Sequence, residues 1–351
     1  MSNKQNVLIL GSGGREHAIA WKISQSSSLG TLHLAPGNGG TSSLAVQTQL
    51  DVNDFKAIGG YALQNSIDII VVGPEDPLVK GISDYFKADA GLSHIFVFGP
   101  SQHAAQLEGS KDFSKQFMIK HGIPTAAYQT FVSGEEEKAC AFLETTNAPY
   151  VLKADGLAAG KGVLIISDLA EAKESCKEML AGKFGAASER LVIEEFLDGI
   201  EVSYFALCDG ENYVLLPEAK DYKRIGEGDT GLNTGGMGAV SPVPFADKAF
   251  TEKVIHQVVA PTIHGLKKDG IPYVGFLFFG LIKVDGEPKV IEYNCRMGDP
   301  ETEVVLPRLK SDLLEAIALA KSGSLNQYKA EFREETATTV IAVSGGYPES
   351  Y

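Results

Sequence analysis

The stretch Val7-Leu-Ile-Leu-Gly-Ser-Gly-Gly-Arg-Glu-His-Ala-Ile-Ala20 decides the fold class at the start of this 351-residue chain. The four apolar residues Val7–Leu10 predict a short buried strand, and the apolar spacing of Arg15–Ser24 predicts a helix. The glycines between them allow a tight turn from the strand into the helix. A strand, a glycine turn and a helix in this order are typical of a parallel α/β domain.

Three further buried strands are predicted within the first hundred residues. They are Thr31–Leu34, Ile67–Val72 and Ile95–Phe98. The last two each end at a Gly-Pro pair, and the segments between all of them are long enough for helices. Short apolar strands that alternate with helices predict a doubly wound parallel sheet over residues 1–103. In such sheets, ligands bind at the carboxyl ends of the strands.

The pattern changes over residues 104–330, which we expect to form a second unit. A helix is predicted at 101–121 and another at Leu169–Leu180, and the range 124–196 contains strands around a glycine-rich loop. The strands predicted there and beyond are Tyr150–Ala154, Gly162–Ile166, Leu191–Glu195, Ser203–Cys208, Tyr213–Glu218, Tyr273–Val284 and Lys289–Asn294. We expect Asp221–Pro244 to be a long polar loop.

The end of the chain is predicted to begin a further domain. A helix over Val304–Ala320 is followed by the strand Thr339–Ser344, and we expect residues 331–351 to be the start of a C-terminal domain that is cut short.

Composition excludes several functional classes. Acidic residues outnumber basic residues 45 to 31, which gives a net charge of −14. This charge disfavours a general nucleic-acid binder, because it repels the phosphate backbone. The four cysteines form no CxxC pair, as expected in a reducing compartment. The chain has no apolar run that could act as a signal peptide or cross a membrane. We therefore expect a cytoplasmic protein without nucleic-acid or membrane partners, and a monomer.

The N-terminal glycine loop is a candidate phosphate site. It consists of Gly11, Ser12, Gly13, Gly14, Arg15 and Glu16. Glycines at a helix N-terminus let backbone N–H groups approach an anion. The dinucleotide fingerprint requires a third glycine where Glu16 stands and an acid after the second strand, which is absent, so a nicotinamide cofactor is disfavoured. The alternative is an ordinary tight turn.

The segment Lys153–Gly162 is a second candidate phosphate site. A Walker A loop would need glycine at position 155 and serine or threonine at 162, where Asp155 and Gly162 stand, and a helix rather than a strand after it. We interpret the segment as a hairpin flap over phosphates, with Lys153 and Lys161 as its charges. The alternative is a glycine hairpin without ligand.

The segment Glu292-Tyr-Asn294-Cys-Arg296 is the most informative local motif. Alternation along a strand places Glu292, Asn294 and Arg296 on one face. A carboxylate and an amide oxygen are hard ligands suited to Mg²⁺ bound to phosphates, and an arginine fork can hold a phosphoryl or carboxylate group. The alternative is a solvated polar face of a strand.

A weaker motif follows the strand Leu191–Glu195. Its residues are Glu194, Glu195, Phe196 and Leu197, with Glu201 a few positions later. Free backbone groups after a strand can pair with an adenine edge, and a carboxylate can hold ribose hydroxyls. An exposed acidic pair without function would look the same.

Together these motifs resemble the glycinamide ribonucleotide synthetase family of ATP-grasp ligases along essentially the whole chain. The segments that carry the resemblance are Gly13–Ala18, Pro36–Asn38, Val72–Gly81, Leu107–Lys111, Lys153–Gly162, Glu194–Gly199, Asp221–Arg224, Thr234–Ala239 and Glu292–Thr302. The resemblance implies an ATP-grasp fold of two α+β subdomains after the N-terminal domain. Many ATP-grasp enzymes carry a further carboxylate on the strand before the Glu-x-Asn pair, whereas Phe278–Leu281 offers none here.

The resemblance also implies roles for individual residues. ATP would be bound by Lys111, Lys153, Gly160, Lys161, Gly162, Glu194, Glu195, Phe196, Leu197 and Glu201. The metal Mg²⁺, with Mn²⁺ as an alternative, would be bound by Glu292 and Asn294. The substrates would be bound by Gly11, Ser12, Gly13, Gly14, Arg15, Glu16, Asn38, Glu75, Asp221, Lys223 and Arg224. The catalytic residues would be Arg296, Lys153 and Asp299.

The implied reaction is the ATP-dependent ligation of glycine to 5-phosphoribosylamine in purine biosynthesis. Glycine would first become glycyl phosphate, and the products would be glycinamide ribonucleotide, ADP and phosphate. One alternative is another ATP-grasp carboxylate–amine ligase. A second is a nucleotide-binding module without chemistry, although Lys111, Lys153, Glu292, Asn294 and Arg296 are all present. A dehydrogenase is disfavoured because the dinucleotide fingerprint fails.

Overall fold

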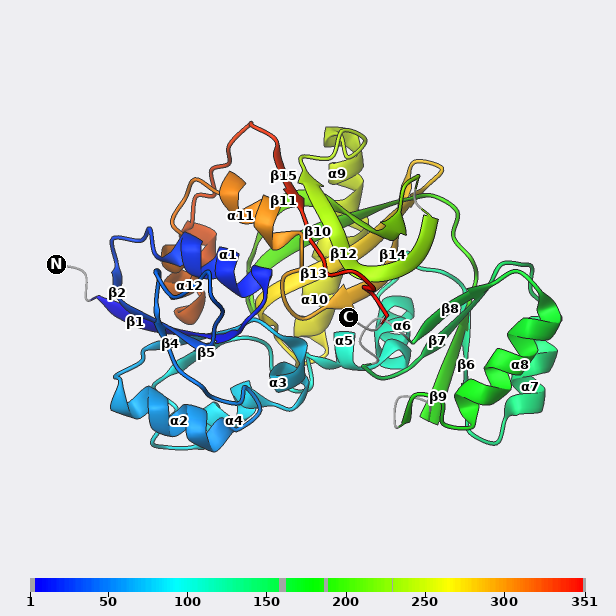
Figure 1. The fold of residues 1–351 in the computed structure, drawn as a ribbon, viewed down its shortest axis with the longest axis horizontal. Helices are drawn as coiled ribbons and strands as arrows, with labels where there is room; N and C mark the ends of the chain where they lie inside the picture. The colour runs from blue at the N-terminus through cyan, green and yellow to red at the C-terminus, as the bar shows by residue number, and fades with distance from the viewer. Residues whose placement is uncertain (1–3, 158–161, 186–188, 229, 350–351) are drawn as a thin grey trace.

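The computed structural model describes residues 4–157, 162–185, 189–228 and 230–349. Three β-sheets organise the chain, with five, six and four strands. Figure 1 shows the five-stranded sheet at one end, the four-stranded sheet with its two helices at the other, and the six-stranded sheet between them.

The N-terminal sheet is parallel and has the strand order β3-β2-β1-β4-β5. Its strands are β1 (Gln5–Gly11), β2 (Leu29–Pro36), β3 (Val46–Gln47), β4 (Ile69–Val72) and β5 (Phe96–Phe98). The helices of this part are α1 (Gly14–Ile23), α2 (Phe55–Gln64), α3 (Glu75–Val79) and α4 (Ile82–Ala88). The predicted parallel sheet is therefore confirmed, and the carboxyl ends of β1 and β4 meet at its centre.

The prediction of a single helix over 101–121 is wrong, because the structure has two helices there. They are α5 (Gln106–Gly109) and α6 (Lys111–Lys120), and Ser110 lies between them in an extended conformation. The Ser110 hydroxyl accepts the Phe113 N–H at 3.1 Å, so a new helix begins there.

The four-stranded sheet is antiparallel, with the order β6-β9-β7-β8. Its strands are β6 (Tyr128–Val132), β7 (Tyr150–Ala154), β8 (Val163–Ile166) and β9 (Arg190–Glu194), and its helices are α7 (Glu136–Leu143) and α8 (Leu169–Leu180). We call this part, from Tyr128 to Glu194, the flap unit. Among the residues that the structure describes, its apolar core is made only of residues between Phe131 and Ile193.

The central sheet has the order β14-β13-β10-β11-β12-β15. Its strands are β10 (Ile200–Asp209), β11 (Tyr213–Gly226), β12 (Thr230–Ser241), β13 (Val274–Val284), β14 (Glu287–Asn294) and β15 (Ala337–Val340). The prediction of a polar loop over Asp221–Pro244 is wrong, because β11 and β12 form a long hairpin there. The strand β15 pairs antiparallel with β12, so residues 337–340 add a strand to this sheet.

Helices cover the central sheet. They are α9 (Lys248–Val254), a π-helical turn (Ile255–Val259), α10 (Ala260–Lys268), α11 (Thr302–Arg308), α12 (Leu313–Lys321) and a 3₁₀ turn (Leu325–Gln327). The helix predicted over Val304–Ala320 is divided in two, because α11 ends at Arg308, Leu309 is extended, and Asp312 caps α12. The Asp312 carboxylate accepts the Leu314 N–H at 2.9 Å.

The N-terminal and central sheets share their apolar cores. One core contains Leu8 of β1 together with Phe279 of β13, and the other contains Ile9 of β1 together with Phe205 of β10. Phe98 and Phe276 meet edge-to-face with ring centroids 5.0 Å apart. These two sheets are therefore packed as one body, whereas the flap unit has a core of its own.

Candidate active site

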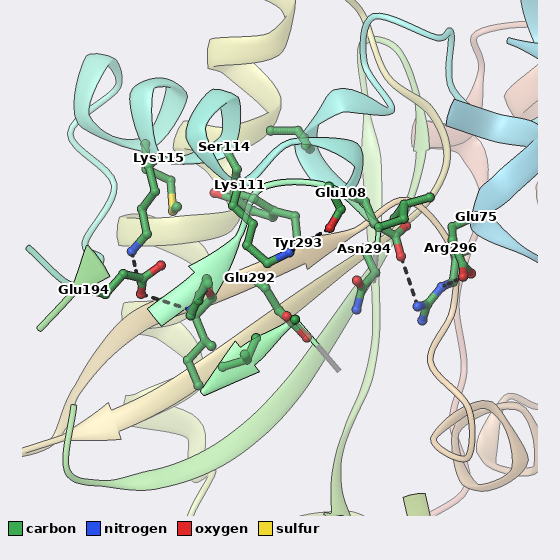
Figure 2. Close-up of a pocket in the computed structure, with 18 residues that line it drawn as sticks. Glu75, Glu108, Lys111, Ser114, Lys115, Glu194, Glu292, Tyr293, Asn294 and Arg296 are labelled. Atoms are coloured by element: carbon green, nitrogen blue, oxygen red, sulfur yellow. Dashed lines mark hydrogen bonds and ion pairs between the residues drawn. The ribbon is translucent and has the colours of Figure 1, made fainter. Parts of the chain in front are cut away.

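A cavity of about 200 Å³ lies where α6, the flap unit and β14 meet (Figure 2). The structure brings eight of the predicted site residues to its wall: Glu75, Lys111, Lys153, Gly162, Glu194, Glu292, Asn294 and Arg296. They come from α3, α6, the flap unit and β14, and Arg296 follows β14 directly. Segments more than 200 residues apart in the sequence thus form one wall, as the predicted nucleotide site requires.

Glu194 is buried at one end of the cavity between two lysines. Its Oε2 atom lies 3.0 Å from Lys153 Nζ and 3.1 Å from Lys115 Nζ. Its other oxygen, Oε1, is buried and has no hydrogen-bond partner within the described part of the chain. A buried acceptor without a partner indicates a place where a ligand donor fits.

Lys115 also lines the cavity, although it was not among the predicted site residues. It lies one turn after Lys111 on α6, and this spacing places both side chains on one helix face toward the cavity. Burial lowers the pKa of Lys115 to about 8, although the Glu194 carboxylate opposes this shift. Burial also lowers the pKa of Lys111, against the attraction of Glu292.

Glu292 faces a group of positive charges. Withdrawal from water would raise the pKa of its carboxyl, but Lys223, Lys153, Lys111 and Arg296 together hold that pKa below its usual value. Glu292 therefore stays ionised, as a metal ligand must.

Asn294 and Arg296 meet a carboxylate that the sequence analysis did not assign, that of Glu108 on α5. Arg296 Nη2 lies 3.0 Å from Glu108 Oε1, and Arg296 Nε lies 3.4 Å from Glu75 Oε2. The Asn294 amide is satisfied when its nitrogen donates to Glu108 Oε1 at 3.0 Å and to the Tyr293 carbonyl at 3.1 Å. Burial raises the pKa of Glu108, and the positive charge of Arg296 opposes that shift.

Several predicted ATP residues do not line the cavity. Glu195 and Phe196 are exposed and Leu197 is half-buried, just after β9. Glu201 is exposed and forms an ion pair with Lys223 at 3.1 Å. Gly160 and Lys161 lie outside the described residues.

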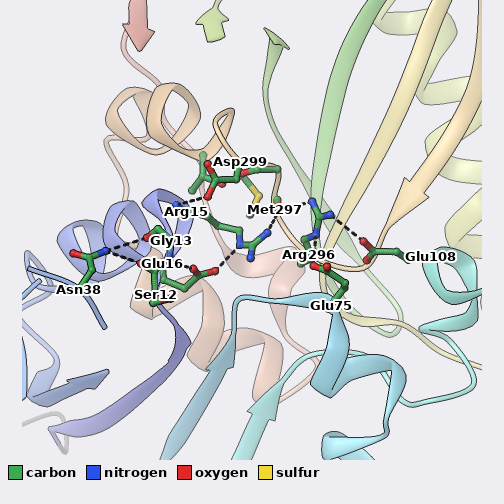
Figure 3. Close-up of polar contacts among 12 residues, drawn as sticks. Ser12, Gly13, Arg15, Glu16, Asn38, Glu75, Glu108, Arg296, Met297 and Asp299 are labelled. Carbon is green, nitrogen blue, oxygen red and sulfur yellow. Dashed lines mark hydrogen bonds and ion pairs between the residues drawn. The ribbon is translucent and has the colours of Figure 1, made fainter. Parts of the chain in front are cut away.

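The N-terminal glycine loop lies beside the cavity (Figure 3) and is held by carboxylates. The Gly13 N–H donates to Glu16 Oε2 at 2.7 Å, and the Arg15 N–H donates to Asp299 Oδ2 at 3.2 Å. Arg15 Nε contacts Glu16 Oε1 at 2.5 Å. Asn38 Nδ2 donates to the carbonyl of Ser12 at 2.8 Å.

Glycine is required on both sides of the Glu16 side chain. A Cβ atom on Gly11 would lie 2.5 Å from the Glu16 carboxyl carbon, and one on Gly73 would lie 2.0 Å from Glu16 Oε1. Gly11 also has φ +124°, which side-chain-bearing residues rarely adopt. The ends of β1 and β4 are therefore shaped to admit this buried carboxylate.

The segment 296–299 connects the loop with the cavity. Arg15 Nη1 donates to the Met297 carbonyl at 3.4 Å, while Arg296 reaches Glu75 and Glu108 on the cavity side (Figure 3). Asp299 itself is exposed and faces the loop. Arg15 and Arg296, on either side of Met297, thus connect the glycine loop with the wall of the cavity.

The three predicted residues of β11 differ in their surroundings. Asp221 is buried 3.5 Å from Lys223, whose pKa is raised because Asp221, Glu201 and Glu292 outweigh the effect of burial. Arg224 instead donates to the carbonyl of Gly231 at 2.9 Å, within the hairpin.

Among the residues that the structure describes, no group of three or more His, Cys, Asp or Glu side chains could hold a metal ion. No helix in this described part of the chain is long and apolar enough to span a bilayer.

The three sheets and the cavity between α6, the flap unit and β14 define an ATP-grasp protein. A family model described as "Phosphoribosylglycinamide synthetase, ATP-grasp (A) domain" matches residues 109–302, and its N-domain counterpart matches residues 5–108. The chain belongs to the phosphoribosylglycinamide synthetase family.

Known proteins agree with this assignment. The chain is 48% identical over 349 residues to "Phosphoribosylamine--glycine ligase" of Vibrio cholerae, which covers 98% of this chain and 80% of that protein. The crystal structure of phosphoribosylamine–glycine ligase from Thermotoga maritima superposes with a TM-score of 0.84 at 37% identity, over 98% of this chain and 81% of the other. An ADP complex of N5-carboxyaminoimidazole ribonucleotide synthetase shares the fold, with a TM-score of 0.70 at 18% identity over 97% and 82% of the two chains.

Proposed function

We propose that this chain ligates glycine to 5-phosphoribosylamine with ATP, giving glycinamide ribonucleotide, ADP and phosphate in purine biosynthesis. The observation that carries the proposal is the convergence of Glu292, Asn294, Lys111, Lys153 and Arg296 on one cavity in a chain of this family. These groups can bind and neutralise a triphosphate even though the protein is acidic overall.

ATP would lie along the cavity with its base toward Glu194. The unpartnered Glu194 Oε1 can accept an exocyclic amino group, and the segment Glu195–Leu197 offers backbone groups to the base edge. Lys153 and Lys111 would contact the phosphates, and Glu201 would contact the ribose. Gly160, Lys161 and Gly162 would cover the phosphates.

Mg²⁺, or Mn²⁺ in its place, would be bound by Glu292 and Asn294. A carboxylate and an amide oxygen fit a hard divalent cation, and two protein ligands suit an ion that takes its remaining ligands from phosphates and water. When bound, the ion would neutralise phosphate charge and polarise the transferred phosphoryl group. The residues present therefore fit the metal that the family implies.

The amine substrate would lie on the surface between Gly13 and Arg296. Gly11, Ser12, Gly13, Gly14, Arg15, Glu16, Asn38 and Glu75 would contact 5-phosphoribosylamine, and Asp221, Lys223 and Arg224 would complete the cleft. Because Glu16 and Asp299 already accept the Gly13 and Arg15 N–H groups, the loop presents carboxylates beside those amides. Carboxylates suit the amino and hydroxyl groups of this substrate.

The proposed chemistry proceeds through glycyl phosphate. A carboxylate is a poor electrophile, and transfer of the γ-phosphoryl group converts one of its oxygens into part of a leaving group. Arg296 and Lys153 would stabilise the charge on the transferred group. Asp299 would orient the amine that attacks the acyl carbon and releases phosphate.

We also propose that the protein acts as a monomer in the cytoplasm, on small molecules only. The four cysteines are free and buried, as is common in a reducing compartment.

The decisive experiment measures ADP release by the purified protein. We expect ADP only when glycine, freshly made 5-phosphoribosylamine, ATP and Mg²⁺ are all present, with glycinamide ribonucleotide formed in equal amount. A different carboxylate or amine that supports faster turnover would identify another ATP-grasp ligase. ATP binding without turnover on any such pair would identify a nucleotide-binding module.

A further inference from the structure

Glu108 on α5 is a charged residue of the cavity to which the proposed function gives no role. Its side chain is buried, and within the described residues its hydrogen bonds and its ion pair are with the segment 294–296. Oε1 lies 3.0 Å from Arg296 Nη2, and it lies 3.0 Å from the Asn294 amide nitrogen when the amide is oriented so that its hydrogen bonds are satisfied. Oε2 accepts the Cys295 N–H at 2.6 Å. One carboxylate thus contacts three consecutive residues.

These contacts determine which way the Asn294 amide faces. The two ends of an amide have nearly the same shape, so only hydrogen bonding distinguishes its orientations. With oxygen toward Glu108, two acceptors would face each other. With nitrogen toward Glu108 and the Tyr293 carbonyl, both bonds form and Oδ1 is turned away from them.

Arg296 is held by the same carboxylate. Its guanidinium is half-buried, and it lies between Glu108 on one side and Glu75 on the other (Figure 2). The contact of Nη2 with Glu108 at 3.0 Å is a charge-assisted pair, whereas Nε has no hydrogen-bond partner within the described residues and faces Glu75 only as an ion pair at 3.4 Å. The Cys295 N–H bond fixes the backbone between the two side chains.

We propose that Glu108 is a positioning residue that turns the oxygen of Asn294 toward the metal–nucleotide complex and fixes Arg296 beside it. The inference depends on the proposed function in one point, since it takes Asn294 as a metal ligand. Glu108 itself would touch neither substrate nor metal. Outer groups that orient metal ligands typically change metal affinity by about 10–100-fold when they are removed.

The substitution Glu108→Gln tests this inference because it keeps the size of the side chain. A carboxylate only accepts hydrogen bonds, whereas glutamine brings an NH₂ group to a place where three donors already converge. The acceptor that holds the Asn294 amide nitrogen is then lost, so the amide oxygen is no longer oriented toward the metal. We expect the dissociation constant of Mn²⁺ in the presence of ADP, measured by electron paramagnetic resonance of free Mn²⁺, to rise about 10-fold or more.

The readout separates positioning from a general loss of structure. ADP binding without metal, measured by calorimetry, should change less than about twofold, because Lys111, Lys153 and Glu194 are intact. The matched control is Asp112→Asn on α6, a buried carboxylate that pairs with Arg190 at 2.8 Å. It should leave the Mn²⁺ affinity unchanged. Glu108→Ala removes the acceptor without adding a donor and should weaken Mn²⁺ binding as Glu108→Gln does.

A double-mutant cycle with Asn294→Ala gives the strictest test. If Glu108 acts through Asn294, Glu108→Gln should weaken Mn²⁺ binding little further once Asn294 is alanine. Fully additive losses, or wild-type affinity in both Glu108 variants, would overturn the inference. If wild-type protein binds ADP but Mn²⁺ does not tighten that binding, the proposed metal site fails instead.

Discussion

Glu292 is the cavity carboxylate on which four positively charged side chains act. Removal of this negative charge leaves the four positive charges to repel one another. It also removes a hard anionic ligand for the metal. We therefore expect Glu292→Gln to keep the fold and to lower kcat on the order of 100-fold or more. Steady-state kinetics over a range of Mg²⁺ concentrations measure this loss.

The matched control for that variant is Glu287→Gln. Glu287 lies at the start of the same strand, β14, is exposed, and pairs with Lys253 on the surface. Its variant should turn over at the wild-type rate. Equal activity of both variants at ordinary Mg²⁺ would place the metal away from Glu292.

Lys115 is expected to make stability depend on pH. Its pKa is about 8 in the folded protein and near 10.5 when the chain is unfolded, so the unfolded state binds more protons between these values. The free energy of unfolding contributed by this group should therefore rise from pH 8 to pH 10. In Lys115→Met this rise should be smaller, as urea denaturation at several pH values would measure. An identical pH dependence in both proteins would show that Lys115 keeps its ordinary pKa.

Residues of the site could be predicted from the sequence where they belong to a local motif. Glu292, Asn294 and Arg296 alternate on one strand, and Lys153 adjoins a glycine loop, so their meeting in the cavity could be foreseen. Glu108 belongs to a helix of only four residues, and its partners lie nearly 190 positions away. Nothing local indicates such a contact. Lys115 could have been predicted as a site residue, because it lies four positions after Lys111 on the same predicted helix.

Among the elements, the flap unit is expected to open by itself. Its core contains flap-unit residues alone among those described, whereas each of the two other cores contains residues of both the N-terminal and the central sheet. The flap unit also contributes Lys153 and Glu194 to the cavity. Hydrogen exchange of β6, β7 and α8 should therefore be faster than that of β1, β4 and β13. Bound nucleotide should slow exchange in the flap unit most, because ligand binds only when the unit is folded. Uniform slowing across the chain would contradict this.

The elements also show where sequence patterns fail. Strands such as Tyr150–Ala154 and the helix Leu169–Leu180 are observed with the predicted bounds, because their apolar periods are clear. The hairpin of β11 and β12 was not predicted, because its many glycines lower the propensity of the sequence for strands. In the structure, the hydrogen bonds between the two strands compensate for that low propensity. The helices between Lys248 and Lys268 were not predicted, although Asp247 is a cap for the first.

At the scale of the whole molecule, the proposed reaction predicts the path of one oxygen atom. Glycine labelled with ¹⁸O in its carboxylate should transfer one labelled oxygen to inorganic phosphate in each turnover, since the acyl phosphate is split by the amine. Mass spectrometry of the phosphate measures the transfer, and ADP should be the other product. Label in AMP would indicate adenylylation, and label in neither would exclude an acyl phosphate.

The shared cores bear on how this protein can exchange parts with its relatives. Leu8 and Ile9, neighbours on β1, belong to two different cores, and each of these cores also contains side chains of the central sheet. A gene crossover near residue 108 would pair an N-terminal unit with a central sheet that did not evolve against it. Crossovers near residues 124 and 196 would carry the whole flap core intact. Recombinant libraries should thus tolerate a foreign flap unit more often than a foreign N-terminal unit. Exchange of whole units between relatives would therefore change nucleotide binding more readily than the choice of substrate.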